Sequence, residues 1–324
     1  MNIVSDIKKQ FGDDIICDGN AIAQSKNIII PWGISITAIL GGGVPEGSFI
    51  TLTGAPKAGK TISALHLASI CQKPEYGNRD VYYFNVEGRI KQRDIDGIKN
   101  LNKDKFHVFS SIKGKILYAE EFLQTAFDII HNAPDSVIII DSYSALCTQV
   151  ESTEGMDKMQ RADGAKLLAK FCRKVSNIIP VNKNIVIGIT HLMGNPGYGT
   201  SEWKEKSGQA IKYQADIRLK ALYFKPWTVD DKQICQEVQW QCETSAIGPP
   251  GQKATSYIRY GEGIDECREL IEIANSVDII KKAGSWYSYE NIKVQGQEKM
   301  RDALLNDKKN YKKLHKEVLS FLCE

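Results

Sequence analysis

The chain has 324 residues, of which 42% are hydrophobic and 25% charged, with a formal net charge of +3. These values are typical of a soluble globular protein with one large or two ordinary domains. No apolar run approaches the ~20 residues of a membrane span, and residues 1–13 lack a signal-peptide pattern. We therefore expect a cytoplasmic protein with no membrane partner. Its eight cysteines form no C-x-x-C pair, which indicates reduced, mostly buried thiols.

The pattern of apolar residues predicts the elements in chain order. Residues 1–12 form a short helix, because Ile3, Ile7 and Phe11 are spaced four apart and Gly12 follows. Apolar strands and amphipathic helices then alternate; the predicted strands are 48–53, 81–86, 136–140 and 184–190, and the predicted helices are 62–70, 117–131 and 166–178. This alternation predicts an α/β fold with a mostly parallel central sheet covered on both faces.

Two later regions differ from this alternation. Strands near 214–223, 235–242 and 254–259 follow one another without long helices, which predicts an antiparallel extension of the sheet. From residue 261 the pattern changes to helices around a short aromatic strand at 285–289. We interpret residues 264–324 as a second, small α+β domain.

One segment of eight residues predicts a phosphate-binding loop. Residues 54–61, GAPKAGKT, fit the pattern G-x-x-x-x-G-K-[ST] and lie between a predicted strand and a predicted helix. The helix N-terminus and the loop N–H groups favour phosphate, Lys60 would reach the β- and γ-phosphates, and Thr61 would hold Mg²⁺. The candidate nucleotide-binding residues are Gly54, Ala55, Pro56, Lys57, Ala58, Gly59, Lys60, Thr61 and Ile62.

Polar side chains end three of the predicted strands. Asp141 lies about 80 residues after the phosphate loop, a position that suits Mg²⁺ coordination together with Thr61. Glu87 is a candidate for the base that orients and deprotonates the attacking water. His191 would face the crevice at the carboxyl ends of the strands. Each residue alone also fits a turn acid or a structural histidine, and the phosphate loop favours the catalytic interpretation.

Four further segments carry a resemblance to a known family. Residues 31–34 (PWGI) and 40–47 (LGGGVPEG) precede the phosphate loop, and residues 260–264 (YGEGI) and 279–289 (IIKKAGSWYSY) follow the strands. Together they resemble the core entry, the domain junction and the C-terminal domain of the bacterial RecA family. The resemblance implies an N-terminal oligomerisation segment at 1–27, a RecA-type P-loop ATPase core at 28–263 and a C-terminal domain at 264–324.

The resemblance also implies an activity. It implies a recombinase that forms a helical filament on single-stranded DNA with ATP and Mg²⁺, pairs it with homologous double-stranded DNA and exchanges strands. Glu87, Lys60 and His191 take the catalytic positions, His191 where the family usually has Gln. A single-strand-binding protein or a loading mediator is an implied partner, and a phage-encoded, UvsX-like relative fits as well as a cellular one. Two alternatives are a regulatory paralogue without strand exchange and a ring-shaped helicase-type motor, against which the C-terminal domain argues.

The same resemblance places two DNA-binding loops at 154–161 and 193–208. Both combine cations, apolar side chains and flexible backbone, a mixture that suits single-stranded DNA. Lys166 and Arg173 are seven residues apart and share one helix face, for which a solvated basic face is the alternative. The candidate DNA-binding residues are Met156, Lys158, Arg161, Lys166, Arg173, Tyr198, Trp203, Lys204, Lys206, Ser207 and Gly208.

The chain departs from the family at three places. The cross-subunit lysine pair of the family corresponds to residues 243–245, where there is no lysine. Either Lys253, or Lys57 within the phosphate loop, supplies the missing cation, or ATP hydrolysis is intrinsically slow and the filaments persist. The arginine pair of the secondary DNA site corresponds to Leu222 and Tyr223. The adenine-stacking tyrosine of the family corresponds to Asp94, so the base must be recognised differently.

Overall fold

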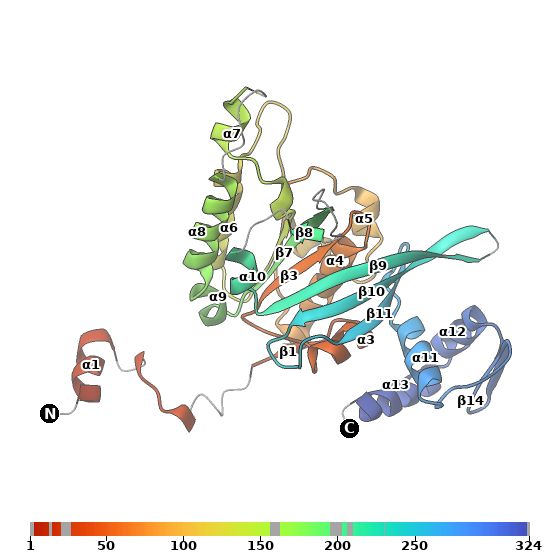
Figure 1. The fold of residues 1–324 in the computed structure, drawn as a ribbon. Helices are drawn as coiled ribbons and strands as arrows, with labels where there is room; N and C mark the ends of the chain where they lie inside the picture. Colours follow the sequence, from red (N-terminus) through yellow and green to blue (C-terminus); the bar gives the residue numbers. More distant parts are fainter. Residues whose placement is uncertain are drawn as a thin grey trace.

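A large twisted sheet runs through the core and carries helices on both faces (Figure 1). The computed structural model describes residues 3–12, 15–20, 27–155, 163–194, 203–205, 210–229 and 231–322. The strands of the large sheet are β3 (Phe49–Gly54), β4 (Val81–Asn85), β5 (Phe106–Phe109), β6 (Val137–Asp141), β7 (Ile185–Gly194), β8 (Trp203–Glu205), β9 (Ile217–Val229), β10 (Lys232–Thr244), β11 (Lys253–Arg259) and β12 (Gly263–Ile264).

The strand order explains where the site lies. The strands pair in the order β12-β11-β10-β9-β3-β7-β6-β4-β5, and β8 pairs with β7. The pairs from β9 to β5 are parallel, whereas β9, β10, β11 and β12 pair antiparallel. This confirms the predicted α/β fold with an antiparallel extension. Because the parallel strands share a direction, the ends of β3, β4, β6 and β7 lie at one edge of the sheet.

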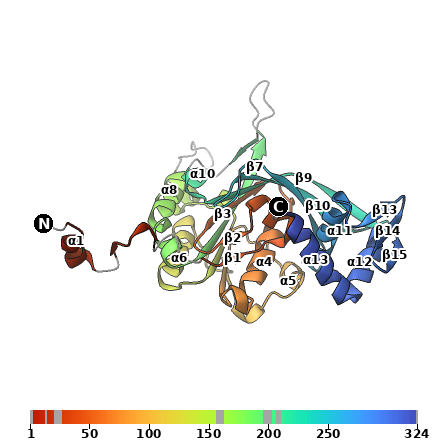
Figure 2. The ribbon, with the colours of Figure 1, turned by 90° about the horizontal axis from the view of Figure 1, so that it is seen from below.

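Helices pack on the two faces of this sheet, as Figure 2 shows. The core helices are α3 (Gly33–Leu40), α4 (Lys60–Cys71), α5 (Gln92–Asp96), α6 (Ala119–Asn132), α7 (Gln149–Thr153), α8 (Asp163–Val175), α9 (Ile178–Val181) and α10 (Ala210–Gln214). Buried Trp32 and Leu65 belong to the apolar cluster under α3 and α4, and Phe122 and Leu168 to the cluster under α6 and α8. The strands are apolar on both sides because both faces are covered.

The C-terminal unit has its own core. It consists of α11 (Glu266–Ser276), a small antiparallel sheet of β13 (Lys281–Ala283), β14 (Trp286–Tyr289) and β15 (Ile292–Gln295), and then α12 (Gln297–Asn306) and α13 (Lys308–Leu322). Leu270, Met300 and Leu314 are fully buried there. This confirms the predicted small α+β unit. The predicted boundary between residues 263 and 264 falls inside β12, which pairs with β11 of the core sheet, and this boundary stays a prediction.

One buried carboxylate joins this unit to the core. Glu269 of α11 accepts hydrogen bonds from the N–H groups of Ile34 (2.8 Å) and Ser35 (2.9 Å) in the first turn of α3. Its side chain is fully buried, and this burial raises the pKa of Glu269 to about 7 although the two N–H groups oppose the rise. Glu269 therefore caps α3 from a different part of the chain.

The N-terminal helix α1 (Ile3–Phe11) lies apart from the core (Figures 1 and 2). None of its residues is buried, and Ile3 and Phe11 expose 71% and 62% of their surface. The short strands β1 (Ile29–Ile30) and β2 (Val44–Pro45) form a separate pair at the core entry. Among the described residues, no helix is both long and apolar enough to cross a membrane, and five of the cysteines are buried free thiols.

Candidate functional site

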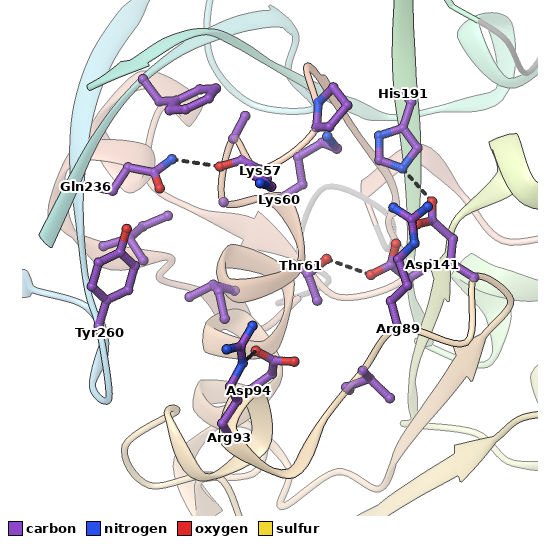
Figure 3. Close-up of a pocket in the computed structure, with 18 of the residues that line it drawn as sticks. Lys57, Lys60, Thr61, Arg89, Arg93, Asp94, Asp141, His191, Gln236 and Tyr260 are labelled. Atoms are coloured by element: carbon purple, nitrogen blue, oxygen red, sulfur yellow. Dashed lines mark hydrogen bonds and ion pairs between the residues drawn. The ribbon is translucent and has the colours of Figure 1, made fainter. Parts of the chain in front are cut away.

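The glycine-rich segment between β3 and α4 forms one wall of the site (Figure 3). Gly59 has φ 78°, and a Cβ atom at this position would lie 2.2 Å from Ile258 Cδ1, so any other residue would be strained and would displace Ile258. Lys57 also has a positive φ of 63°. The carbonyl of Lys57 accepts a hydrogen bond from Gln236 Nε2 of β10 at 2.9 Å. The antiparallel extension thus holds the loop in place.

Lys60, the first residue of α4, is buried beneath this loop with 4% of its surface exposed. Its Nζ donates to the carbonyls of Gly54 (2.9 Å) and Ala55 (2.7 Å). Burial lowers the pKa of Lys60 to about 8, a fall that the nearby Asp141 and Glu87 carboxylates limit. The ammonium group therefore stays charged at neutral pH.

Thr61 and Asp141 meet beside Lys60. Thr61 Oγ1 donates a hydrogen bond of 2.6 Å to Asp141 Oδ2, and Tyr83 Oη donates one of 2.7 Å to the same oxygen. Burial raises the pKa of Asp141, and these two hydrogen bonds oppose the rise. A hydroxyl and a carboxylate are the hard oxygen donors that Mg²⁺ prefers, usually with phosphates and waters as its other ligands. Among the described residues, no group of three or more His, Cys, Asp or Glu side chains is arranged to hold a metal ion.

Glu87 and His191 face each other across the ends of β4 and β7. The distance between Glu87 Oε1 and His191 Nε2 is 2.5 Å, and Ser142 Oγ donates to the same carboxylate oxygen at 2.6 Å. Arg89 Nη1 lies 3.2 Å from Glu87 Oε2. The hydrogen bond from His191 is the main reason why the pKa of Glu87 falls to about 2, and Ser142 and Arg89 add to the effect. The carboxylate is therefore ionised at all pH values of interest.

These groups line a single pocket of about 670 Å³, a volume within the range of small-molecule sites. The structure brings together Lys57, Lys60, Thr61, Glu87, Asp141 and His191, as the sequence predicts. Of the predicted loop residues, positions 56–62 line the pocket, and the carbonyls of Gly54 and Ala55 lie behind it as acceptors for Lys60.

Sequence reasoning missed several residues outside the phosphate loop that line the pocket. Arg93, Phe224, Gln233, Gln236 and Tyr260 also line the pocket. Tyr260 could have been found, because it begins the segment YGEG that marks the domain junction. The others have no signal in the sequence, since they come from α5 and from strands whose pairing brings them to the pocket.

Most of the predicted DNA-binding residues lie outside the described part of the chain. This applies to Met156, Lys158, Arg161, Tyr198, Lys206, Ser207 and Gly208. The backbone of Trp203 and Lys204 forms β8, which pairs with the end of β7. Lys166 and Arg173 are exposed on α8, with Lys166 Nζ 3.3 Å from Asp163 Oδ1. Their DNA contacts stay predictions.

Glu243 lies at the position that corresponds to the family's lysine pair, and it forms ion pairs within the chain. Glu243 Oε2 lies 2.8 Å from Arg218 Nη2, and its other oxygen lies 3.9 Å from Lys220 Nζ. The Glu243 charge is therefore compensated within the chain. Lys57 lines the pocket, whereas Lys253 begins β11 and does not. Of the two predicted substitute cations, Lys57 alone could act within the same subunit.

The fold and the pocket together define a class of protein. A glycine loop between a central parallel strand and a helix, with acids at the ends of two neighbouring strands, characterises α/β P-loop proteins that bind nucleoside triphosphates. The antiparallel extension and the small C-terminal unit narrow this class further, and comparison with known proteins identifies the family.

Residues 1–265 match the RecA N-terminal domain family and residues 268–322 match the RecA C-terminal domain family. The chain belongs to the RecA family. It is 29% identical over 322 residues to Protein RecA of Caldanaerobacter subterraneus subsp. tengcongensis, a match that covers 97% of this chain and 91% of the relative. It is 30% identical over 303 residues to Protein RecA of Fusobacterium nucleatum subsp. nucleatum, covering 92% and 78%. The resemblance expected from the sequence is thus confirmed.

Proposed function

We propose that this member of the RecA family is an ATP-dependent recombinase that forms a helical filament on single-stranded DNA. It pairs that strand with homologous double-stranded DNA, exchanges strands and hydrolyses ATP in a DNA-stimulated reaction. The observation that carries the proposal is the pocket in which Lys60, Thr61, Asp141, Glu87 and His191 converge. This pocket supplies a phosphate-binding cation, hard oxygen donors and an ionised base in one place.

Hydrolysis is accelerated by a residue beside the γ-phosphate that orients the attacking water or accepts its proton. Glu87 is ionised and can accept a proton from a water, and Ser142 keeps its carboxylate in position. Lys60 would bind the β- and γ-phosphates in place of its present carbonyl acceptors. Thr61 and Asp141 would hold Mg²⁺, which when bound neutralises charge on the phosphates.

His191 is suited to link the nucleotide to DNA. Its Nε2 now donates to Glu87, and a neutral imidazole has a single N–H, so a γ-phosphate would compete for that donor. His191 lies on β7, which continues to Gly194 and pairs antiparallel with β8; both strands contain residues of the predicted second DNA loop. A change at the His191 ring would therefore act on a strand that leads directly into this loop.

The remaining partners follow from the same proposal. The exposed apolar side chains of α1, which include Ile3 and Phe11, suit a contact with a neighbouring subunit in the filament. Lys166 and Arg173 on α8 would bind the phosphates of the DNA strand. We infer a cytoplasmic protein that also meets a single-strand-binding protein or a loading mediator on its DNA.

The cation that replaces the missing lysine pair can be tested by mutation. Cations that stabilise the transferring phosphoryl group are worth about 10³–10⁵ in rate in other nucleotide hydrolases. We expect Lys57→Ala or Lys253→Ala to lower DNA-stimulated hydrolysis at least about tenfold, which is about 1.4 kcal/mol of barrier. A fast rate that survives both changes and their combination would contradict the idea that either lysine is the substitute.

A strand-exchange assay with a circular single strand and a homologous linear duplex tests the proposal, with Lys60→Ala as the inactive control. The proposal predicts joint molecules that need ATP and homology.

The alternative is a regulatory paralogue that binds ATP and a recombinase partner. One observation favours it: Glu243, at the position of the lysine pair, is paired with Arg218. ATP binding without joint molecules at any protein concentration would support that alternative.

A further inference from the structure

Arg89 is a cation in the pocket that belongs to none of the site residues predicted from the sequence. It lines the pocket, and its Nη1 atom lies 3.2 Å from Glu87 Oε2. In Figure 3, Arg89 and His191 stand together on the side of the pocket away from Tyr260. The guanidinium therefore lies next to the carboxylate of the proposed base.

The backbone that carries Arg89 is held in place, whereas its side chain is accessible. Gly88 has φ 65°, so the chain turns sharply directly after Glu87. The buried Asn85 at the end of β4 then accepts hydrogen bonds through Oδ1 from the N–H groups of Arg89 (3.0 Å) and Ile90 (3.3 Å). The Arg89 side chain is 79% exposed, against 13% for Glu87. A long side chain on an anchored backbone can exchange one anionic partner for another without a change in the fold.

The two oxygens of Glu87 have different surroundings. Oε1 already accepts hydrogen bonds from Ser142 Oγ and His191 Nε2, which engage both of its lone pairs. Oε2 pairs with Arg89. Oε2 is thus the oxygen at which Glu87 can take a proton from water, and Arg89 covers it while the guanidinium stays in its present position.

We propose that Arg89 shifts from Glu87 Oε2 to the γ-phosphate when ATP binds, and that it supplies from within the subunit the cation that the family takes from a neighbouring subunit. A guanidinium carries five N–H donors in a rigid fork that matches phosphate oxygens. In Figure 3, Lys60 lies on the side of the phosphate loop and Arg89 on the side of β4, so the two would hold the γ-phosphate from two sides. This role of Arg89 rests on the proposed function, because it assumes that the phosphates of ATP bind at Lys60.

The shift of Arg89 serves the hydrolysis step in two ways. In that step the water oxygen forms a bond to the γ-phosphorus and the water proton passes to Glu87 Oε2. The bond from this phosphorus to the bridging oxygen breaks and leaves its electron pair on ADP. Moving Arg89 uncovers Oε2 for the proton and brings a positive charge to the phosphoryl oxygens. A cation in the same subunit also explains how Glu243, at the position of the family's lysine pair, can be engaged with Arg218 inside the chain.

Phosphate release by Arg89→Ala with saturating ATP and single-stranded DNA gives the first test. Cations that stabilise the transferring phosphoryl group are worth about 10³–10⁵ in rate in other nucleotide hydrolases, so we expect a fall of at least about a hundredfold. Lys91→Ala is the matched control, because Lys91 is an exposed cation two residues further on that does not line the pocket. Its rate should stay within about twofold of the wild type.

Calorimetric titration with ATPγS and with ADP gives a second readout that does not depend on turnover. Arg89→Ala should weaken ATPγS binding about tenfold, the loss expected for one hydrogen bond between charged groups. ADP binding should stay unchanged because ADP lacks the γ-phosphate, and it shows at the same time that the variant is folded.

Two further measurements separate this role from its alternatives. If Arg89 acts on the phosphate, adding Arg89→Ala to Glu87→Gln should slow the residual hydrolysis further, by at least about tenfold. No further loss would show that Arg89 acts only through Glu87 and would overturn the inference. A mixture of Arg89→Ala chains with Glu87→Gln chains on DNA should hydrolyse ATP no faster than the two do separately. Restored hydrolysis would show that Arg89 acts on the nucleotide of a neighbouring subunit, against the inference.

Other results bear on Arg89 alone or on the proposed function as well. A wild-type rate in Arg89→Ala would overturn the role of Arg89, as would equal weakening of ATPγS and ADP. A wild-type chain that neither binds ATPγS nor hydrolyses ATP would contradict the proposed function itself. Hydrolysis that Lys60→Ala abolishes and Arg89→Ala leaves intact contradicts the role of Arg89 alone.

Discussion

Replacing Glu87 by Gln removes the proposed base and leaves the shape of the site. Glutamine has the same size, and its carbonyl oxygen can still accept the hydrogen bonds from Ser142 and His191. A positioned general base typically contributes about 10²–10⁴ in rate, which corresponds to about 2.7–5.4 kcal/mol of barrier. We therefore expect Glu87→Gln to slow DNA-stimulated hydrolysis by about that factor while ATP binding and assembly on DNA persist.

Phosphate release measured with saturating single-stranded DNA gives the rate, and ATPγS titration of the same preparation gives the binding. The pKa of about 2 for Glu87 adds a second expectation, since this carboxylate stays ionised. The wild-type rate should show no loss attributable to Glu87 between pH 5 and 8. Hydrolysis by Glu87→Gln at the wild-type rate would refute the assignment of the base, and so would loss of ATPγS binding, which would indicate a structural role.

Three further changes test other parts of the structure. Lys60→Ala should abolish productive ATP binding, because we propose that its buried ammonium group binds the β- and γ-phosphates; ATPγS titration checks this. The double change Lys166→Ala, Arg173→Ala should weaken single-stranded DNA binding and make its log–log salt dependence shallower by about 0.7 per lost contact, and an unchanged slope would remove α8 from the DNA site. Glu269 has a pKa of about 7 in the fold against an ordinary 4.5, so the folded state binds its proton more tightly and the free energy of unfolding should fall as pH rises from about 4.5 to 7, by at most about 3 kcal/mol. Urea denaturation at pH 5 and pH 8 should show this fall in the wild type and not in Glu269→Gln.

The parts of the fold that depend on local pattern could be predicted from the sequence. The phosphate loop, the strands at the sheet centre and the aromatic strand β14 (Trp286–Tyr289) follow from turn chemistry and from runs of apolar residues. The predicted helix 166–178 starts three residues too late, and α8 ends at Val175 before a turn leads into α9. Helix boundaries depend on capping and packing, which apolar spacing does not encode.

The parts that depend on strand pairing could not be predicted. Strands β9 and β10 each have 13 residues and are longer than the predicted segments 214–223 and 235–242. They are longer because they continue to pair with each other beyond the edge of β3. No apolar pattern in the sequence indicates this extension. The same pairing brings Gln236 to the carbonyl of Lys57. His191 and Glu87 are 104 positions apart in the sequence. They meet only because β4, β6 and β7 are neighbours in the sheet.

Electron microscopy of the chain with single-stranded DNA, Mg²⁺ and a non-hydrolysable ATP analogue tests the central claim most directly. The account predicts helical filaments along the DNA that need the nucleotide and that Lys60→Ala does not form. Closed rings, or isolated protomers on DNA at protein concentrations where ATPγS is fully bound, would contradict it.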